Sequence, residues 1–96
     1  MQDDKDRFYR QAQIFKALAH SSRLCIIDRL SRGECTPGEL TKLIGSDAST
    51  VSKHLAVLRA QGIVRERRAG SEVYYRLLMP CVLGFFDCIA QVHGDQ

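Results

Sequence analysis

Apolar side chains recur every three to four residues in the first third of the chain, a spacing that predicts helices. A first helix is expected over roughly residues 5–19. Ser21 is the expected cap of a second helix, which runs to about Arg32 and stops at Gly33. The apolar positions that define these two helices are Phe8, Ile14, Phe15, Leu18, Leu24, Ile26, Ile27 and Leu30.

Two more helices are expected in the middle of the chain, separated by a very short turn. The segment 36–39 combines a threonine cap, a proline at the first helical position and a glutamate at the third, and it predicts a helix that ends near Gly45. Asp47 is the expected cap of a fourth helix that runs to Gln61, with Gly62 as its terminator. A turn of this length between two helices is typical of a helix-turn-helix.

The last third of the chain begins with a change of pattern. Residues 63–68 and 72–77 are β-prone runs joined by a short glycine-containing turn, which predicts a hairpin. Pro80 is expected to open a last helix that reaches about Val92. The sequence therefore predicts a mainly α fold of five helices with a β-hairpin wing, in a single domain over residues 1–96.

Length and composition limit the class of protein. The chain has 96 residues, of which 45% are hydrophobic, so it can form a small core and is too apolar for a disordered chain. A core of this size is marginal, and a dimer is a reasonable way to bury more surface. Neither a signal peptide nor a membrane-spanning run is recognisable, so we expect a cytoplasmic location, reduced cysteines and no membrane partner.

Positive charge is concentrated in the fourth helix and the hairpin. Residues 53–68 hold five lysines and arginines against one glutamate, whereas the whole chain has a net charge of +3. Such a concentration is typical of a nucleic-acid-binding surface, the alternative being a solvated charged face. The side chains expected to contact DNA are Ser49, Thr50, Ser52, Lys53, His54, Arg67 and Arg68. The opposite face of the fourth helix, with Val51, Leu55 and Leu58, is expected to be core.

In combination, these features resemble the ArsR/SmtB-type bacterial transcriptional repressors. The segments that carry the resemblance are 16–20, 23–24, 38–40, 49–55, 58–59, 62–64, 67–68 and 74–77. The resemblance implies a winged helix-turn-helix homodimer whose first and last helices form the interface. It also implies a repressor that leaves its operator, an inverted repeat of double-stranded DNA, when an inducer binds, often a metal or metalloid ion. Ser21 and Ser22 stand where such proteins commonly carry a proline.

Four cysteines are the other informative set, and none of them forms a CxxC pair, which argues against a zinc ribbon. Cys81 and Cys88 lie one heptad apart on one face of the last helix, beside its main apolar stripe. Soft thiolates prefer thiophilic ions. The expected inducer site is therefore formed by Cys35, Cys81 and Cys88, within one protomer or across the dimer. Its expected ligand is As(III), Sb(III) or another soft ion, with no cofactor required for DNA binding itself.

Two other interpretations remain open at this stage. The same cysteines could form a disulfide or polysulfide, which makes a redox or persulfide sensor. Alternatively, they are packing residues in a DNA-binding module without an inducer. An enzyme is not expected, because no cysteine has a His-Asp or His-Asn arrangement near it in sequence.

Overall fold

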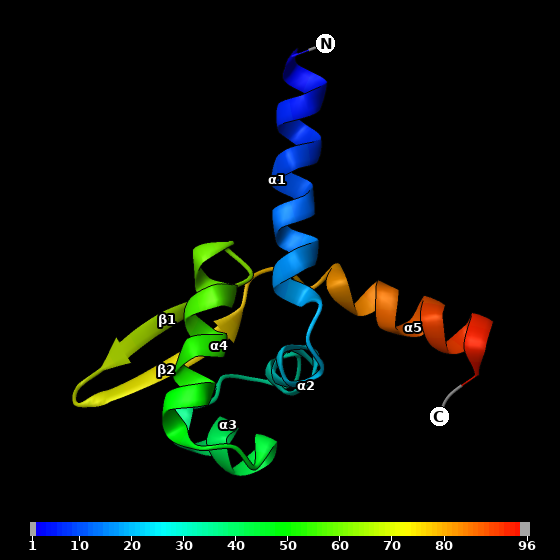
Figure 1. Cartoon of the computed structure of the whole chain (residues 1–96). Helices are drawn as coiled ribbons and strands as arrows, with labels where there is room; N and C mark the ends of the chain where they lie inside the picture. Colours follow the sequence, from blue (N-terminus) through cyan, green and yellow to red (C-terminus); the bar gives the residue numbers. More distant parts are fainter. Residues whose placement is uncertain (1, 95–96) are drawn as a thin grey trace.

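The computed structural model describes residues 2–94, which form five helices and a two-stranded antiparallel hairpin (Figure 1). The elements are α1 (Gln2–Leu18), α2 (Ser21–Leu30), α3 (Pro37–Ile44), α4 (Ala48–Ala60), β1 (Val64–Ala69), β2 (Glu72–Leu77) and α5 (Val82–His93). This order confirms the predicted mainly α fold with a hairpin wing. The bounds differ from the predicted ones by at most three residues, and those of β2 coincide with the prediction. The largest difference is at α1, which begins three residues early.

Side-chain caps explain where α3 and α4 begin, and both caps are the predicted ones. Thr36 Oγ1 accepts a hydrogen bond from the Glu39 N–H at 3.2 Å, and Glu39 Oε1 accepts one from the Thr36 N–H at 2.8 Å. Asp47 Oδ1 accepts from the Thr50 N–H at 2.7 Å. Gly45 ends α3 with a φ of 80°, a left-handed conformation that favours glycine. The turn between the two helices is thus set by local chemistry on both sides.

The predicted cap of α2 is wrong by one residue. His20 occupies the cap position, and its Nδ1 accepts a hydrogen bond from the Ser22 N–H at 3.1 Å. Ser21 is the first residue of the helix instead. A histidine ring nitrogen can serve the same purpose as a hydroxyl here, because an acceptor near the first free N–H groups is all that a cap requires.

The core lies between α2, α3, α4 and the base of the hairpin. The predicted core positions on α4, Val51, Leu55 and Leu58, are at most 2% exposed. They pack in one cluster with Ile26, Ile27, Leu30, Leu40, Ile63 and Val64. The hairpin is anchored to this cluster through Tyr75, which is 8% exposed and belongs to β2. The helix-turn-helix and the wing therefore share one packed base.

The helices α1 and α5 extend away from this base in different directions (Figure 1). Among residues 4–94, the buried positions of these two helices are at the ends next to the base, at Ala17, Leu18 and Val82. The large apolar side chains that stay exposed on these two helices are Phe8, Tyr9, Phe15, Phe85, Ile89 and Val92. Within residues 2–94, no helix combines the length and the apolar character needed to span a membrane.

Candidate nucleic-acid interface and thiol positions

The first half of α4 presents small polar and basic side chains to solvent. Ser49, Ser52 and Lys53 are exposed, and Thr50 is partly buried. The Ser49 hydroxyl donates to Asp47 Oδ1 at 3.0 Å, so the capping carboxylate also orients this serine. A helix that is hydroxyl- and lysine-bearing on one side and apolar on the other can lie in a DNA major groove and offer donors and acceptors to base edges.

His54 does not belong to this exposed face, and its burial contradicts the expected contact with DNA. The side chain is 7% exposed, and its Nδ1 accepts a hydrogen bond from Arg23 Nε at 3.2 Å. Its ring lies 4.4 Å from the ring of His20, centroid to centroid. Burial lowers the pKa of His54, and the charges of His20 and Arg23 lower it further. Position 54 follows Val51 by three residues, so helical spacing places it with the buried stripe.

The hairpin places its two predicted DNA-contacting arginines at consecutive positions of β1. Arg67 pairs with Tyr74 and Arg68 with Val73 across the antiparallel ladder, so the two side chains lie on opposite faces. Both arginines are exposed. Gly70 has a φ of 64° in the turn that joins the strands, a conformation typical of tight hairpins.

Three arginines share one face of the hairpin, and two of them, Arg65 and Arg76, are not among the expected DNA contacts. Arg65 pairs directly with Arg76 across the two strands. Arg67 lies two positions after Arg65 on β1, so its side chain is on the same face. Like charges directly opposite each other destabilise a sheet. A bound anion would relieve this repulsion. Only the register, which the sequence does not reveal, places Arg76 opposite Arg65.

Comparisons with known proteins show the family of this chain. The family model described as "Bacterial regulatory protein, arsR family" matches residues 20–66, from the cap of α2 to β1. The biofilm growth-associated repressor of Xylella fastidiosa is 40% identical over 76 residues, covering 79% of this chain and 67% of that protein. The chain belongs to the ArsR family. It is a DNA-binding transcriptional regulator of the winged helix-turn-helix type and not an enzyme.

Solved structures similar to this ArsR-family chain share its whole architecture. The crystal structure of NolR from Sinorhizobium fredii has a TM-score of 0.85 and 29% identity, covering 98% of this chain and 94% of that one. The solution structure of Mb0332 from Mycobacterium bovis has a TM-score of 0.80 and 31% identity, covering 93% of this chain and 82% of that one. Mb0332 is described as a homodimeric winged helix-turn-helix DNA-binding domain.

In this ArsR-family chain, the three thiols of the expected inducer site are not brought together within one protomer. Cys35 is 0% exposed in the core cluster, where burial raises the pKa of its thiol, whereas Cys81 and Cys88 are exposed at α5. Among residues 2–94, no three His, Cys, Asp or Glu side chains are grouped as a metal site requires. The expected set therefore does not fit a three-coordinate ion in a single chain, because Cys35 is occupied with packing.

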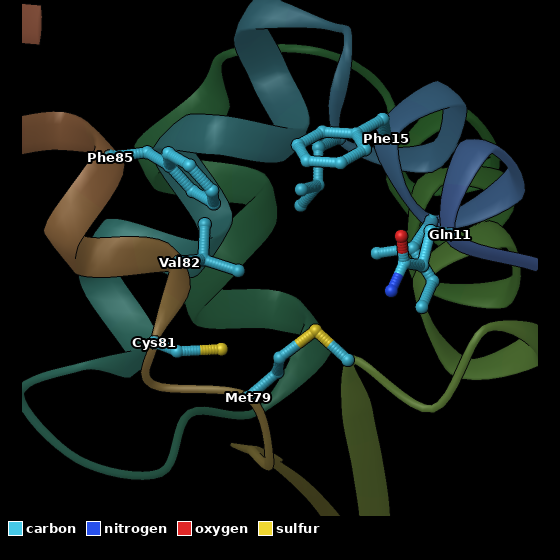
Figure 2. A pocket seen from close by; sticks show the side chains of 8 residues that line it. Gln11, Phe15, Met79, Cys81, Val82 and Phe85 are labelled. Carbon is cyan, nitrogen blue, oxygen red and sulfur yellow. The ribbon is translucent and has the colours of Figure 1, made fainter. Parts of the chain in front are cut away.

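Cys81 has a setting that distinguishes it from the other cysteines. It immediately precedes α5 and lines an apolar hollow of about 290 Å³ between α1 and α5 (Figure 2). Phe15 and Phe85 meet edge-to-face in this region, with their ring centroids 5.7 Å apart and an angle of 64° between the rings. The fourth thiol, Cys25, is exposed on α2. A chemical change at Cys81 is thus placed where it can alter how α1 and α5 pack.

Proposed function

We propose that the chain is a homodimeric, sequence-specific repressor that binds an inverted-repeat operator. The observation that carries this function is the outward face of α4, where Ser49, Ser52 and Lys53 are exposed; the hairpin adds a face shared by Arg65, Arg67 and Arg76. The side chains of α4 can read base edges, and the arginines of the hairpin can neutralise phosphates of the DNA backbone. Because operator DNA lies in the bacterial cytoplasm, we expect the protein to be cytoplasmic and to have no membrane partner.

A homodimer is supported by the apolar surface of α1 and α5. Phe8, Phe15, Ile89 and Val92 are each more than half exposed on these helices. Large apolar side chains exposed in this number on two helices mark an interface in a small protein. The similar Mb0332 domain is described as homodimeric. Two-fold symmetry then presents one copy of α4 to each half of an inverted repeat.

Release from the operator is assigned to the thiols at α5. Cys81 and Cys88 are exposed, the first immediately before α5 and the second on it, so a ligand on them acts on the helix proposed to form the dimer and on the spacing of the two DNA-reading helices. Their sulfur chemistry suits As(III), Sb(III) or another soft ion. Cys35 is left as a packing residue. Because Cys81 and Cys88 lie about 10 Å apart along the helix axis, a site for one ion requires thiols from the second protomer.

A second candidate trigger is oxidation or persulfidation of the same two thiols. It is favoured by their exposure, because reactive cysteines are accessible ones, and it needs no third ligand. Both triggers predict that DNA binding itself requires no cofactor.

A release titration tests these proposals. An operator is first recovered by in vitro selection from a random duplex library. The complex is then titrated with As(III), Sb(III), Cd(II), Zn(II), polysulfide or peroxide while fluorescence anisotropy is followed. Release by a soft ion with a matching mass increase supports the metalloid site, and release with added sulfur or a disulfide supports the redox site. Release by none of these reagents contradicts both triggers and leaves the DNA-binding function standing.

A further inference from the structure

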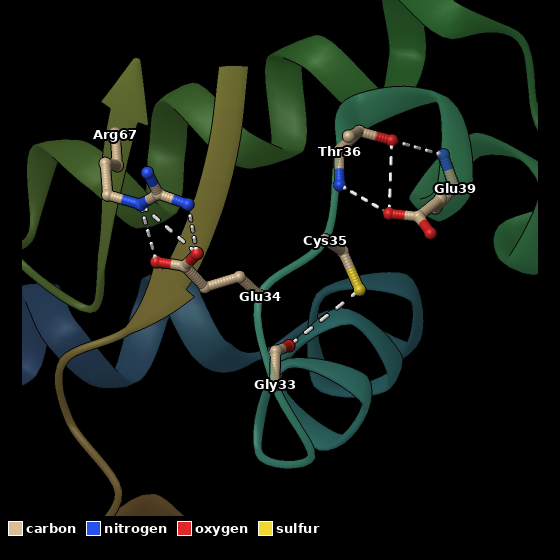
Figure 3. A network of polar contacts seen from close by, with 6 residues as sticks. All are labelled: Gly33, Glu34, Cys35, Thr36, Glu39 and Arg67. Atoms are coloured by element: carbon tan, nitrogen blue, oxygen red, sulfur yellow. Dashed lines mark hydrogen bonds and ion pairs between the residues drawn. The ribbon is translucent and has the colours of Figure 1, made fainter. Parts of the chain in front are cut away.

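Glu34 holds the guanidinium group of Arg67 from outside the hairpin (Figure 3). Nη2 of Arg67 donates to Oε1 of Glu34 at 2.7 Å, and Nε donates to Oε1 at 3.2 Å and to Oε2 at 3.1 Å. These hydrogen bonds lower the pKa of the Glu34 carboxyl group, which therefore stays charged at neutral pH. The ring of Tyr74 lies 4.9 Å from the guanidinium carbon. Arg67 is thus fixed by a carboxylate at its edge and by an aromatic ring at its face.

The backbone on both sides of this ion pair is also fixed. Glu34 precedes Cys35, whose N–H donates to the Tyr75 carbonyl at 3.1 Å and whose carbonyl accepts from the Tyr75 N–H at 2.8 Å. Arg67 lies in the β1–β2 ladder opposite Tyr74. The bidentate contact therefore joins two anchored segments that are 33 positions apart in the chain.

The ion pair lies on the arginine face of the hairpin. Among residues 2–94, neither Arg65 nor Arg76 has a carboxylate within ion-pair distance, whereas Arg67 does. The charge of Arg76 adds to the lowering of the pKa of Glu34, which places this carboxylate within the field of that face. One arginine of a surface suited to phosphates is therefore already neutralised by the protein itself.

We propose that Glu34 determines the affinity of the DNA interface by competing with a phosphate for Arg67. A carboxylate and a phosphate take the same bidentate edge of a guanidinium group, here Nε and Nη2. Binding of this edge to DNA then exchanges one anion for another, so Glu34 lowers the contribution of the wing to affinity. Phosphate contacts carry no sequence information, so the effect is the same on operator and unrelated DNA. The inference rests on the proposed DNA-binding function.

The test measures binding to a duplex of random sequence by fluorescence anisotropy over a series of KCl concentrations. Glu34→Gln is expected to tighten binding by about threefold. It is also expected to steepen the plot of log K against log salt by about one, the value for one further phosphate contact. Glu34→Asp keeps the charge but shortens the side chain, and a smaller gain is expected.

Asp28→Asn is the matched control, because it makes the same change of net charge at another exposed ion pair, 3.1 Å from Arg32 on α2. The control is expected to leave affinity and slope near the wild-type values. In an Arg67→Ala background, Glu34→Gln is expected to have no larger effect than the control. Melting curves of each variant verify the fold.

The inference is overturned if Glu34→Gln weakens binding, matches Asp28→Asn, or acts equally well without Arg67. Wild-type protein that binds no DNA overturns both this inference and the proposed function. Wild-type binding that Glu34→Gln leaves unchanged overturns this inference alone.

Discussion

Arg23 of α2 donates a hydrogen bond from Nε to Nδ1 of His54 on α4 over 3.2 Å. The same guanidinium group donates from Nη1 to the Ala17 carbonyl near the end of α1, also at 3.2 Å. One side chain thus joins the helix that is proposed to read DNA to α1, a helix proposed to form the dimer. A change in the packing of α1 can therefore act on α4 through the two hydrogen bonds of Arg23.

The buried position of His54 predicts a pH dependence of stability. Because burial and the charges of His20 and Arg23 lower its pKa in the folded state, the unfolded chain binds the proton first as pH falls below about 6.5. The free energy of unfolding should therefore decrease from that pH down to the folded pKa. His54→Gln should flatten this decrease in urea denaturation at pH 7.5, 6.5 and 5.5.

The control for this experiment is His93→Gln, since His93 is exposed in the last turn of α5. That variant should keep the wild-type dependence on pH. A His54→Gln protein with an unchanged slope would show that another group titrates in this range.

Local signals in the sequence were sufficient for the elements and most caps. The Thr36 and Glu39 pattern and Asp47 each predict a helix start from residues within one turn, because a cap is a local interaction. The buried stripe of α4 also follows from spacing alone. The cap of α2 was misassigned because a histidine is rarely the acceptor there.

Contacts between distant segments could not be predicted in the same way. The ion pair of Glu34 with Arg67 depends on the strand register and on the bridge of Cys35 to Tyr75. The burial of His54 depends on Arg23 arriving from α2. Charge and spacing along one segment do not reveal which partner comes from another.

Capping of α4 is expected to matter for both stability and DNA binding. Asp47→Ala removes the acceptor of the Thr50 N–H and should lower the melting temperature by about 5 °C. It should also weaken DNA binding, because Ser49 loses its hydrogen-bond partner. Asp47→Asn is the control, since asparagine caps almost equally well.

Acid should remove the benefit of this cap. Hydrogen bonds from Thr50 and Ser49 lower the pKa of Asp47 below 3.8 in the folded state. Its contribution to stability is therefore present above the ordinary pKa and is lost as pH falls through the folded value. Melting temperatures of wild type and Asp47→Asn that fall in parallel below pH 4 would contradict this assignment.

The proposed dimer depends on the apolar surface of α5. Ile89 is 58% exposed in the single chain, and Ile89→Asp should convert a dimer into a monomer at micromolar concentration in sedimentation velocity, because it would bury an unpaired charge. Leu78→Asp, at an exposed apolar residue outside α1 and α5, should leave the dimer intact. A dimeric Ile89→Asp protein would place the interface elsewhere.

The cysteines should separate into a packing residue and responsive residues. Cys35→Ser puts a hydroxyl group into a fully buried site and should cost about 1–3 kcal/mol of stability while leaving the inducer response unchanged. Cys81→Ser and Cys88→Ser should leave the stability unchanged and should weaken the inducer response, since both thiols are exposed. Full release from the operator in the double Cys81→Ser, Cys88→Ser protein would exclude these thiols as the sensor.

The exposed face of α4 is tested most directly by comparing two duplexes in one anisotropy experiment. One is the selected inverted repeat, and the other is a scrambled duplex of the same composition. We predict that two protomers bind the repeat at least about 1,000-fold more tightly than the scrambled duplex at physiological salt. Ser52→Ala and Lys53→Ala should reduce this ratio, whereas Arg68→Ala should weaken binding to both duplexes alike. Equal affinity of the wild-type protein for the two duplexes would contradict the account.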